Sequence, residues 1–270
     1  MCGIFGVSGS TPAVPLIAAG LKKLEYRGYD SSGIAVNGEK GIWLCKSAGS
    51  LSRLEKKLNQ SAPPLSSVGI GHTRWATHGK ATDLNAHPFL SADGMFAVAH
   101  NGIIENYTGL KAFLSEKGFS LVSDTDSEVV PMLLEYFYDG DVLKAIRRAV
   151  SELEGAFSLA IITSRAPDCV FAARKDSSLA IGCGKGCSFV SSDIPALSGF
   201  AEQCCIPDEN SVAVLRKGEI KLFDRQGNRT APSFKPTGEC GGDAEKGDFP
   251  FFMLKEIFSQ PRCLTAVSYT

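Results

Sequence analysis

Apolar residues in the first hundred positions occur in short runs bounded by glycine, serine or asparagine, a pattern typical of strands. The last predicted strand of this region runs into an Asn-Gly turn at Asn101, and an Asn-Gly signal at Asn37 indicates a hairpin. The predicted strands are CGIFGVSG (2–9), SSGIAV (31–36), GIWLCKSAG (41–49), the start of SVGIGHTRWATHG (67–79) and GMFAVAHNGII (94–104).

Helical spacing of apolar residues alternates with these runs and then dominates the middle of the chain. The predicted helices are VPLIAAGLKKLEYRG (14–28), SLSRLEKKLNQ (50–60), NYTGLKAFLSEKG (106–118), DTDSEVVPMLLEYFYDG (124–140) and DVLKAIRRAVSELEG (141–155). The fourth begins with capping and acidic residues, including Asp124, and contains Pro131. A proline in that position means that the helix starts late or is kinked.

After Gly155 the pattern is mostly strands again, at 156–163, 169–175, 179–184, 188–193, 211–218 and 219–224. Many strands combined with a block of helices favour packed sheets covered by helices, an α+β arrangement, over a repeating βαβ series. The Gly-rich stretch near 237–248 is typical of a linker. We therefore predict one domain over residues 1–236, with 237–270 as a linker and the start of a further, missing part.

Composition and charge exclude several classes of protein. The 270 residues are 44% hydrophobic and carry a net charge of -1, which gives no signal for nucleic-acid or membrane partners. No run approaches the ~18 apolar residues of a membrane span, and no secretory signal is visible, so we expect a cytoplasmic protein. The nine cysteines are an odd number, which favours free thiols in a reducing compartment.

Metal and phosphate sites receive little support from the motifs. Cys183 and Cys187 are closely spaced, but zinc sites usually contain two tight ligand pairs, and all four histidines lie far away between His72 and His100. The glycine-rich IGCGKGCS lacks the Gly-Lys-Ser/Thr ending of a phosphate loop, so we predict a turn between strands.

Four stretches are rich in polar, turn-forming residues at points where core strands should end. Together they contain an arginine, an amide, a backbone donor beside a glycine and paired carboxylates, which suit the binding of a zwitterionic amino acid and of an oxyanion. The stretches are LEYRGYDSSG (24–33), GHTRWATHG (71–79), AHNGIIENY (99–107) and SDTDSE (123–128).

Cys2 has two interpretations. It is a small apolar residue at the start of a strand, or it becomes the first residue after removal of Met1. In the second case it carries a thiol and a free α-amine, a nucleophile with its own base.

Six motifs in the same order give the chain a specific resemblance. MCGIFGV, LEYRGYDSSGIAV, GIGHTRWATHG, NAHPF, HNGIIENY and SDTDSEVV together resemble the glutaminase domains of the glutamine–fructose-6-phosphate aminotransferases. These domains are class II glutamine amidotransferases, which are N-terminal nucleophile hydrolases. The resemblance extends from residue 1 to about 261 and implies a four-layer αββα sandwich.

The resemblance also implies roles for particular residues. Cys2 would attack the side-chain amide of glutamine, and Asn101 with the Gly102 N–H would form the oxyanion hole. Arg74 would bind the α-carboxylate of glutamine and Asp126 its ammonium group. Trp75, Thr77 and His78 would shape the pocket, and no cofactor or metal is implied.

Several alternatives remain open. In the full-length enzymes ammonia serves to convert fructose 6-phosphate into glucosamine 6-phosphate, through a sugar-isomerase part that this chain lacks. The module could instead feed a different acceptor, as in the amidophosphoribosyltransferases, or bind glutamine without cleaving it as a regulatory domain. A thiol- or metal-binding protein is a further alternative, and a homodimer is left open.

Overall fold

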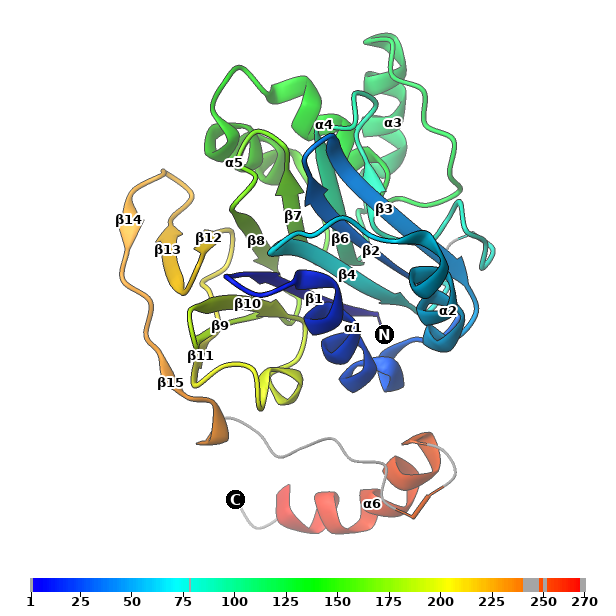
Figure 1. Ribbon diagram of the computed structural model, residues 1–270, viewed down its shortest axis with the longest axis vertical. Coiled ribbons are helices and arrows are strands. Elements are labelled where there is room, and N and C mark those ends of the chain that lie inside the picture. The colour runs from blue at the N-terminus through cyan, green and yellow to red at the C-terminus, as the bar shows by residue number, and fades with distance from the viewer. Residues whose placement is uncertain (1, 78, 240–247, 250–251, 268–270) are drawn as a thin grey trace.

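Two antiparallel sheets lie face to face and helices cover both outer faces (Figure 1). The computed structural model describes residues 2–77, 79–239, 248–249 and 252–267. In these residues the elements form four layers, in the order helices, sheet, sheet, helices. The predicted αββα sandwich is therefore confirmed.

The first sheet has Cys2 at the beginning of one of its central strands. All its neighbouring strands pair in antiparallel fashion. Its spatial order is β15 (Lys235–Pro236), β11 (Gln203–Cys205), β9 (Ala180–Gly184), β10 (Cys187–Ser191), β1 (Gly3–Ser8), β4 (Val68–Arg74), β2 (Ser31–Gly38) and β3 (Gly41–Ala48).

The second sheet carries Asn101 and Gly102 at the end of a strand near one edge. Its pairs are also antiparallel. The order is β14 (Arg229–Thr230), β13 (Glu219–Phe223), β12 (Val212–Arg216), β8 (Val170–Lys175), β7 (Phe157–Thr163), β6 (Phe96–Gly102) and β5 (Phe89–Leu90).

Each sheet has its own helical cover (Figure 1). The first sheet packs against α1 (Ala13–Lys23) and α2 (Leu51–Ser61), and the second against α3 (Tyr107–Glu116), α4 (Val129–Phe137) and α5 (Val142–Glu152). The short 3₁₀ turns are η1 (Glu25–Arg27), η2 (Pro195–Leu197) and η3 (Thr237–Glu239), and α6 (Phe252–Val267) follows them. None of the helices in the described residues is long and apolar enough to cross a membrane.

The layers are held together by three apolar cores of different character. Small and branched residues such as Ala97, Ala160 and Ile162 fill the space between the sheets. Larger residues such as Phe5 and Phe157 fill the outer cores, under the helices. Because the middle core uses small side chains, the two sheets approach closely enough for their strand ends to form one site.

Most of the predicted elements are confirmed. Pro131 lies in the first turn of α4, so that helix starts late, as predicted. The IGCGKGCS turn is the β9–β10 hairpin, with Lys185 and Gly186 at positive φ. β5, β11, β14 and β15 were not predicted, because strands of two or three residues are too short to show a period.

One prediction about α4 is wrong. Its first turn holds no acidic residue, and its N-cap residue Glu128 makes no side-chain capping bond. The Glu128 carboxylate instead accepts the N–H groups of Val122 and Ser123, and Asp124 accepts from the Asn85 amide. These carboxylates hold the loop before the helix rather than the helix itself.

Candidate active site

Three strand ends bring Cys2, Arg74 and Asn101 to one end of the space between the sheets. Gly3 pairs with Thr73, which places the start of β1 beside the end of β4. Ile4 belongs to the core between the sheets, and strand alternation puts Cys2 on that same face. β6 reaches this end from the second sheet, and Asn101 lies on the same face as Ala99.

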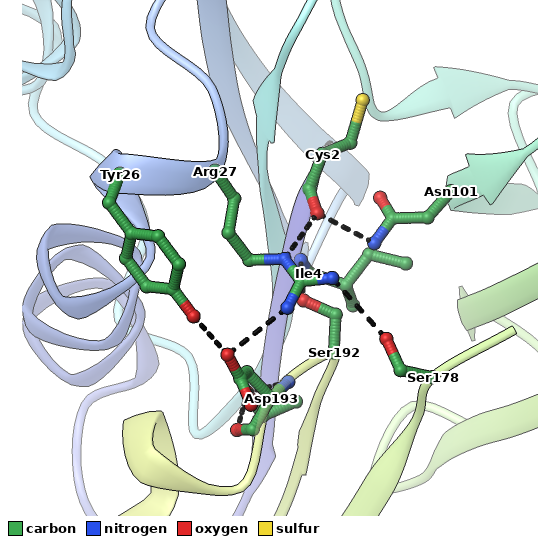
Figure 2. A network of polar contacts seen from close by, with 9 residues as sticks. Cys2, Ile4, Tyr26, Arg27, Asn101, Ser178, Ser192 and Asp193 are labelled. Carbon is green, nitrogen blue, oxygen red and sulfur yellow. Dashed lines mark hydrogen bonds and ion pairs between the residues drawn. The ribbon is translucent and has the colours of Figure 1, made fainter. Parts of the chain in front are cut away.

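The backbone of Cys2 is fixed by two donors to its carbonyl oxygen. Arg27 Nε and Asn101 Nδ2 each donate to Cys2 O at 3.1 Å (Figure 2). Asp193 holds the Arg27 guanidinium through an ion pair at 3.1 Å and also accepts from the Tyr26 hydroxyl. Arg27 had no predicted role, and its place in the polar stretch 24–33 is the only signal of it in the sequence.

The Cys2 thiol lies against the backbone of Trp75. The Trp75 N–H donates to Cys2 Sγ at 3.4 Å, and the thiol contacts Trp75 O at 3.6 Å. Burial raises the pKa of Cys2. The hydrogen bond from Trp75 and the positive charges of Arg74 and Arg27 oppose this shift. The thiol is therefore protonated near neutral pH and needs a base before it can attack.

Asn101 and Gly102, at the end of β6, each have an N–H group that is not used in pairing with β7. The Asn101 amide has two N–H groups on Nδ2, so one remains after the bond to Cys2 O. The Ile103 N–H donates to the carbonyl oxygen of Ala156, the residue just before β7. Since such bonds alternate along an antiparallel pair, the Gly102 N–H points to the opposite side of β6, away from β7.

Only glycine fits at position 102. Its φ is +117°, and a Cβ there would collide with Ala156 O.

Arg74 and Asp126 are both buried near the nucleophile. Arg74 is 4% exposed, and its guanidinium donates to Lys80 O at 3.2 Å and Gly79 O at 3.4 Å. Burial lowers the pKa of Arg74, while Cys2, Asp30 and Asp126 oppose the shift. The Asp126 carboxylate accepts the Ile104 N–H at 2.8 Å, so it ties the loop after β6 to the site.

The remaining predicted pocket residues lie in the loop after β4. Trp75 is half-buried and makes an edge contact with the ring of Tyr29, with centroids 5.4 Å apart. Thr77 is exposed, and His78 lies outside the described residues. Asp30 accepts the Ala76 N–H at 2.8 Å and so anchors this loop, a contact that the sequence did not reveal.

Three buried histidines, His72, His87 and His100, lie behind Asn101. Burial lowers the pKa of His72 to about 3 and that of His87 well below the usual value. His100 contacts Ser127 Oγ through Nδ1 at 2.7 Å. All three rings are neutral near pH 7 and therefore act through hydrogen bonds rather than charge.

The cysteines of the second half do not form a metal site in the described part of the chain. Cys183 and Cys187 flank the tip of a hairpin, and within the described ranges no three His, Cys, Asp or Glu side chains could hold an ion. The site instead combines a thiol on Cys2, an amide on Asn101 and the charged groups of Arg74 and Asp126. These are the kinds of group expected for acyl transfer to a thiol.

Comparisons with known proteins identify the domain to which the chain is similar. A family model for the glutamine amidotransferase domain matches residues 72–199. A glutamine–fructose-6-phosphate aminotransferase from Clostridium tetani is 43% identical over 264 residues, covering 98% of this chain and 43% of that protein. The corresponding protein from Symbiobacterium thermophilum is 45% identical, again covering 98% of this chain and 43% of the relative.

Solved structures show the same fold. The glutamine phosphoribosylpyrophosphate amidotransferase from B. subtilis matches with a TM-score of 0.73 at 24% identity, over 84% of this chain and 50% of that one. The likeness places the chain in the class of four-layer sandwiches with two antiparallel sheets between helices. The chain belongs to the family of glutamine amidotransferase domains, and it spans about 43% of the length of the aminotransferases it matches.

Proposed function

We propose that the chain hydrolyses the side-chain amide of L-glutamine through a thioester on Cys2. The observation that carries the proposal is the hydrogen bond from Asn101 Nδ2 to the backbone carbonyl of Cys2, at the end of the sandwich where β1 begins and β6 ends. Family membership supports the same chemistry. Cys2, Asn101 and Gly102 are the proposed catalytic residues.

The reaction begins with proton transfer from the thiol. After removal of Met1, which lies outside the described residues, the α-amine of Cys2 has a pKa of ~7.7–8.0 and can accept the Sγ proton. The sulfur attacks the amide carbonyl carbon, and the carbonyl electron pair moves onto oxygen. Asn101 Nδ2 and the Gly102 N–H stabilise this oxyanion.

Collapse of the tetrahedral intermediate breaks the carbon–nitrogen bond. The protonated α-amine gives its proton to the leaving nitrogen, and ammonia departs. Water, deprotonated by the same amine, then attacks the thioester carbonyl. The carbon–sulfur bond breaks, glutamate is released and the thiol recovers its proton.

Recognition of glutamine falls to Arg74 and Asp126 in this proposal. Arg74 would bind the α-carboxylate with its planar guanidinium group, which the carbonyls of Gly79 and Lys80 help to hold in place. Asp126 would pair with the substrate ammonium group. Trp75, Thr77 and His78 would cover the pocket, since they follow Arg74 in the loop that Asp30 anchors.

The acceptor of the ammonia is proposed from the relatives. Their names point to amination of fructose 6-phosphate, which gives glucosamine 6-phosphate, in a part of the protein beyond residues 1–236. The linker that we propose at 237–270 contains the helix α6, which exposes Met253, Ile257, Phe258 and Leu264. A cytoplasmic location and a homodimer belong to the same proposal, and no nucleic acid, membrane, cofactor or metal is invoked.

A different acceptor is the second candidate. The fold likeness to a phosphoribosylpyrophosphate amidotransferase is compatible with it, but at 24% identity the likeness concerns the fold alone. Ammonia transfer to fructose 6-phosphate by the protein carrying this domain would decide between the two.

Labelling of Cys2 with an electrophilic glutamine analogue tests hydrolysis directly. We expect intact mass to show loss of Met1 and one adduct, and we expect Cys2→Ala to lose both the adduct and glutaminase activity by a factor on the order of 10⁴ or more. Cys45→Ala is the control, because Cys45 is also a half-buried free thiol. Full activity in Cys2→Ala would refute the mechanism, and glutamine binding without glutamate formation would indicate a regulatory domain.

A further inference from the structure

Two buried histidines, His72 and His87, form a hydrogen-bonded pair that contacts the oxygen of the Asn101 amide. His87 Nδ1 lies 3.2 Å from His72 Nδ1, and the rings meet edge to face with centroids 4.1 Å apart. His72 Nε2 lies 2.9 Å from Asn101 Oδ1 and 2.9 Å from His100 O. The Asn101 side chain thus links the histidine pair to Cys2 by hydrogen bonds.

The contacts determine which nitrogen of His72 carries the proton. Nε2 faces two oxygens that can only accept, so it must be the N–H donor. In the neutral ring Nδ1 then has a lone pair and accepts from His87 Nδ1–H. His87 Nε2 is left with a lone pair, and it is buried with no hydrogen-bond partner among the residues that the structure describes.

The surroundings keep both rings neutral. Both side chains are almost completely buried, which disfavours a charged imidazole. The positive charge of Arg74 opposes protonation of both rings, and that of Lys46 opposes protonation of His87. A neutral His72 has one donor and one acceptor, so its tautomer depends on the partner at Nδ1.

We propose that His72, held in its Nε2–H tautomer by His87, is a positioning residue that fixes the orientation of the Asn101 amide. With Oδ1 bound to His72, the Nδ2 group faces Cys2 and donates to Cys2 O at 3.1 Å. If the amide rotated by half a turn, Oδ1 would face the developing oxyanion and repel it. This inference rests on the proposed hydrolysis, since it assigns the residue that orients the proposed oxyanion donor.

Substitutions that keep or remove the donor test this role. His72→Gln retains an amide N–H that can reach Asn101 Oδ1, whereas His72→Leu has none. We expect His72→Leu to lower kcat on the order of 10²-fold with little change in KM for glutamine, because only the transition-state donor is misplaced. We expect His72→Gln to recover most of that loss.

A double-mutant cycle separates positioning from structural damage. If His72 acts through Asn101, His72→Leu should cost almost nothing further in an Asn101→Ala background. An equal loss of kcat in both backgrounds would overturn the proposal. So would an unchanged kcat in His72→Leu, or a failure of His72→Gln to exceed His72→Leu when both remain folded by circular dichroism.

Nitrogen-15 NMR of the histidine rings gives a readout that needs no activity. We expect Nε2–H on His72 and Nδ1–H on His87 at pH 7, with neither ring titrating between pH 5 and 8. A His72 ring protonated on Nδ1, or charged at pH 7, would overturn the assignment. A parent protein that is inactive after Met1 removal but has these tautomers would refute the hydrolysis and support the orientation of Asn101.

Discussion

The space between the two sheets has an apolar half and a polar half, although the same strands line both. β4 contributes Val68 and Ile70 to the apolar half, then His72 and Arg74 to the polar half, all on one face. β6 changes in the same way, from Ala97 to Asn101. The strand period is unbroken across the change, so backbone geometry is the same in both halves.

The difference lies in how each half is stabilised. The apolar half gains about 25 cal/mol per Å² of buried apolar surface, a gain that depends on area and not on direction. In the polar half, buried groups must find partners, because an unpaired one costs about 1–3 kcal/mol. The apolar half therefore stabilises the fold, while the polar half holds specific atoms in specific directions.

The first way to test the comparison is to make a cavity in the apolar half. Ile162 is completely buried between the sheets. We expect Ile162→Ala to lower the free energy of unfolding by about 2–5 kcal/mol, with kcat of the folded protein near that of the parent. Denaturant titration and glutaminase assays at low temperature measure both quantities, and Ile162→Val should cost about 0.5–1.5 kcal/mol. A selective loss of kcat would show that the halves are not separable.

The opposite outcome is expected in the polar half. Asn101→Ala removes the proposed oxyanion donor and should lower kcat about 10²–10³-fold, equivalent to about 2.7–4 kcal/mol. Stability should fall less, because His72 Nε2 retains its contact with His100 O. Steady-state kinetics and thermal unfolding provide the two measurements. An Asn101→Ala variant with normal kcat would exclude Asn101 from the oxyanion hole.

The same comparison explains what could be predicted from the sequence. Strands such as β4 and β6 were predictable because period and turn signals are local properties of the chain. The resemblance supplied Cys2, Arg74, Asn101 and Asp126, and the structure brings these four to one end of the sandwich. The chemistry of each remains a proposal.

The supporting contacts could not be predicted in this way. Arg27 reaches Cys2 O across 25 positions, and His87 meets His72 through a ring contact between separate segments. Such pairs depend on how the strands are placed in three dimensions. No local pattern encodes them, so an isolated histidine or arginine gives no signal.

Gly28 lies against the backbone of Arg74 and Trp75 at the boundary of the polar half, and a substitution there should have a smaller effect. A Cβ on Gly28 would lie 2.6 Å from Arg74 C and 2.7 Å from Trp75 N, whose N–H donates to Cys2 Sγ. We expect Gly28→Ala to displace this backbone, to cost about 1–3 kcal/mol of stability and to lower kcat. Gly109→Ala is the matched control, because nothing lies within 4 Å of its Cβ position. It should be neutral or stabilise α3 by about 0.5–1 kcal/mol, as measured by thermal unfolding.

The smallest expected effect is a pH dependence of stability that arises in the polar half. The unfolded chain protonates His72 near its usual pKa of about 6.5, whereas burial lowers the pKa in the folded state to about 3. Between these values only the unfolded state binds the proton, so stability falls as pH falls through this window.

His72→Gln removes this titration and should therefore have a shallower acid slope. We expect the stability difference between parent and variant to change by about 1 kcal/mol between pH 6 and pH 5. Urea titrations at the two pH values measure it, with Ile162→Val as a control that should follow the parent slope. Parallel curves for His72→Gln and the parent would mean that His72 accepts a proton in the folded state. Its neutral tautomer could then not be what orients Asn101.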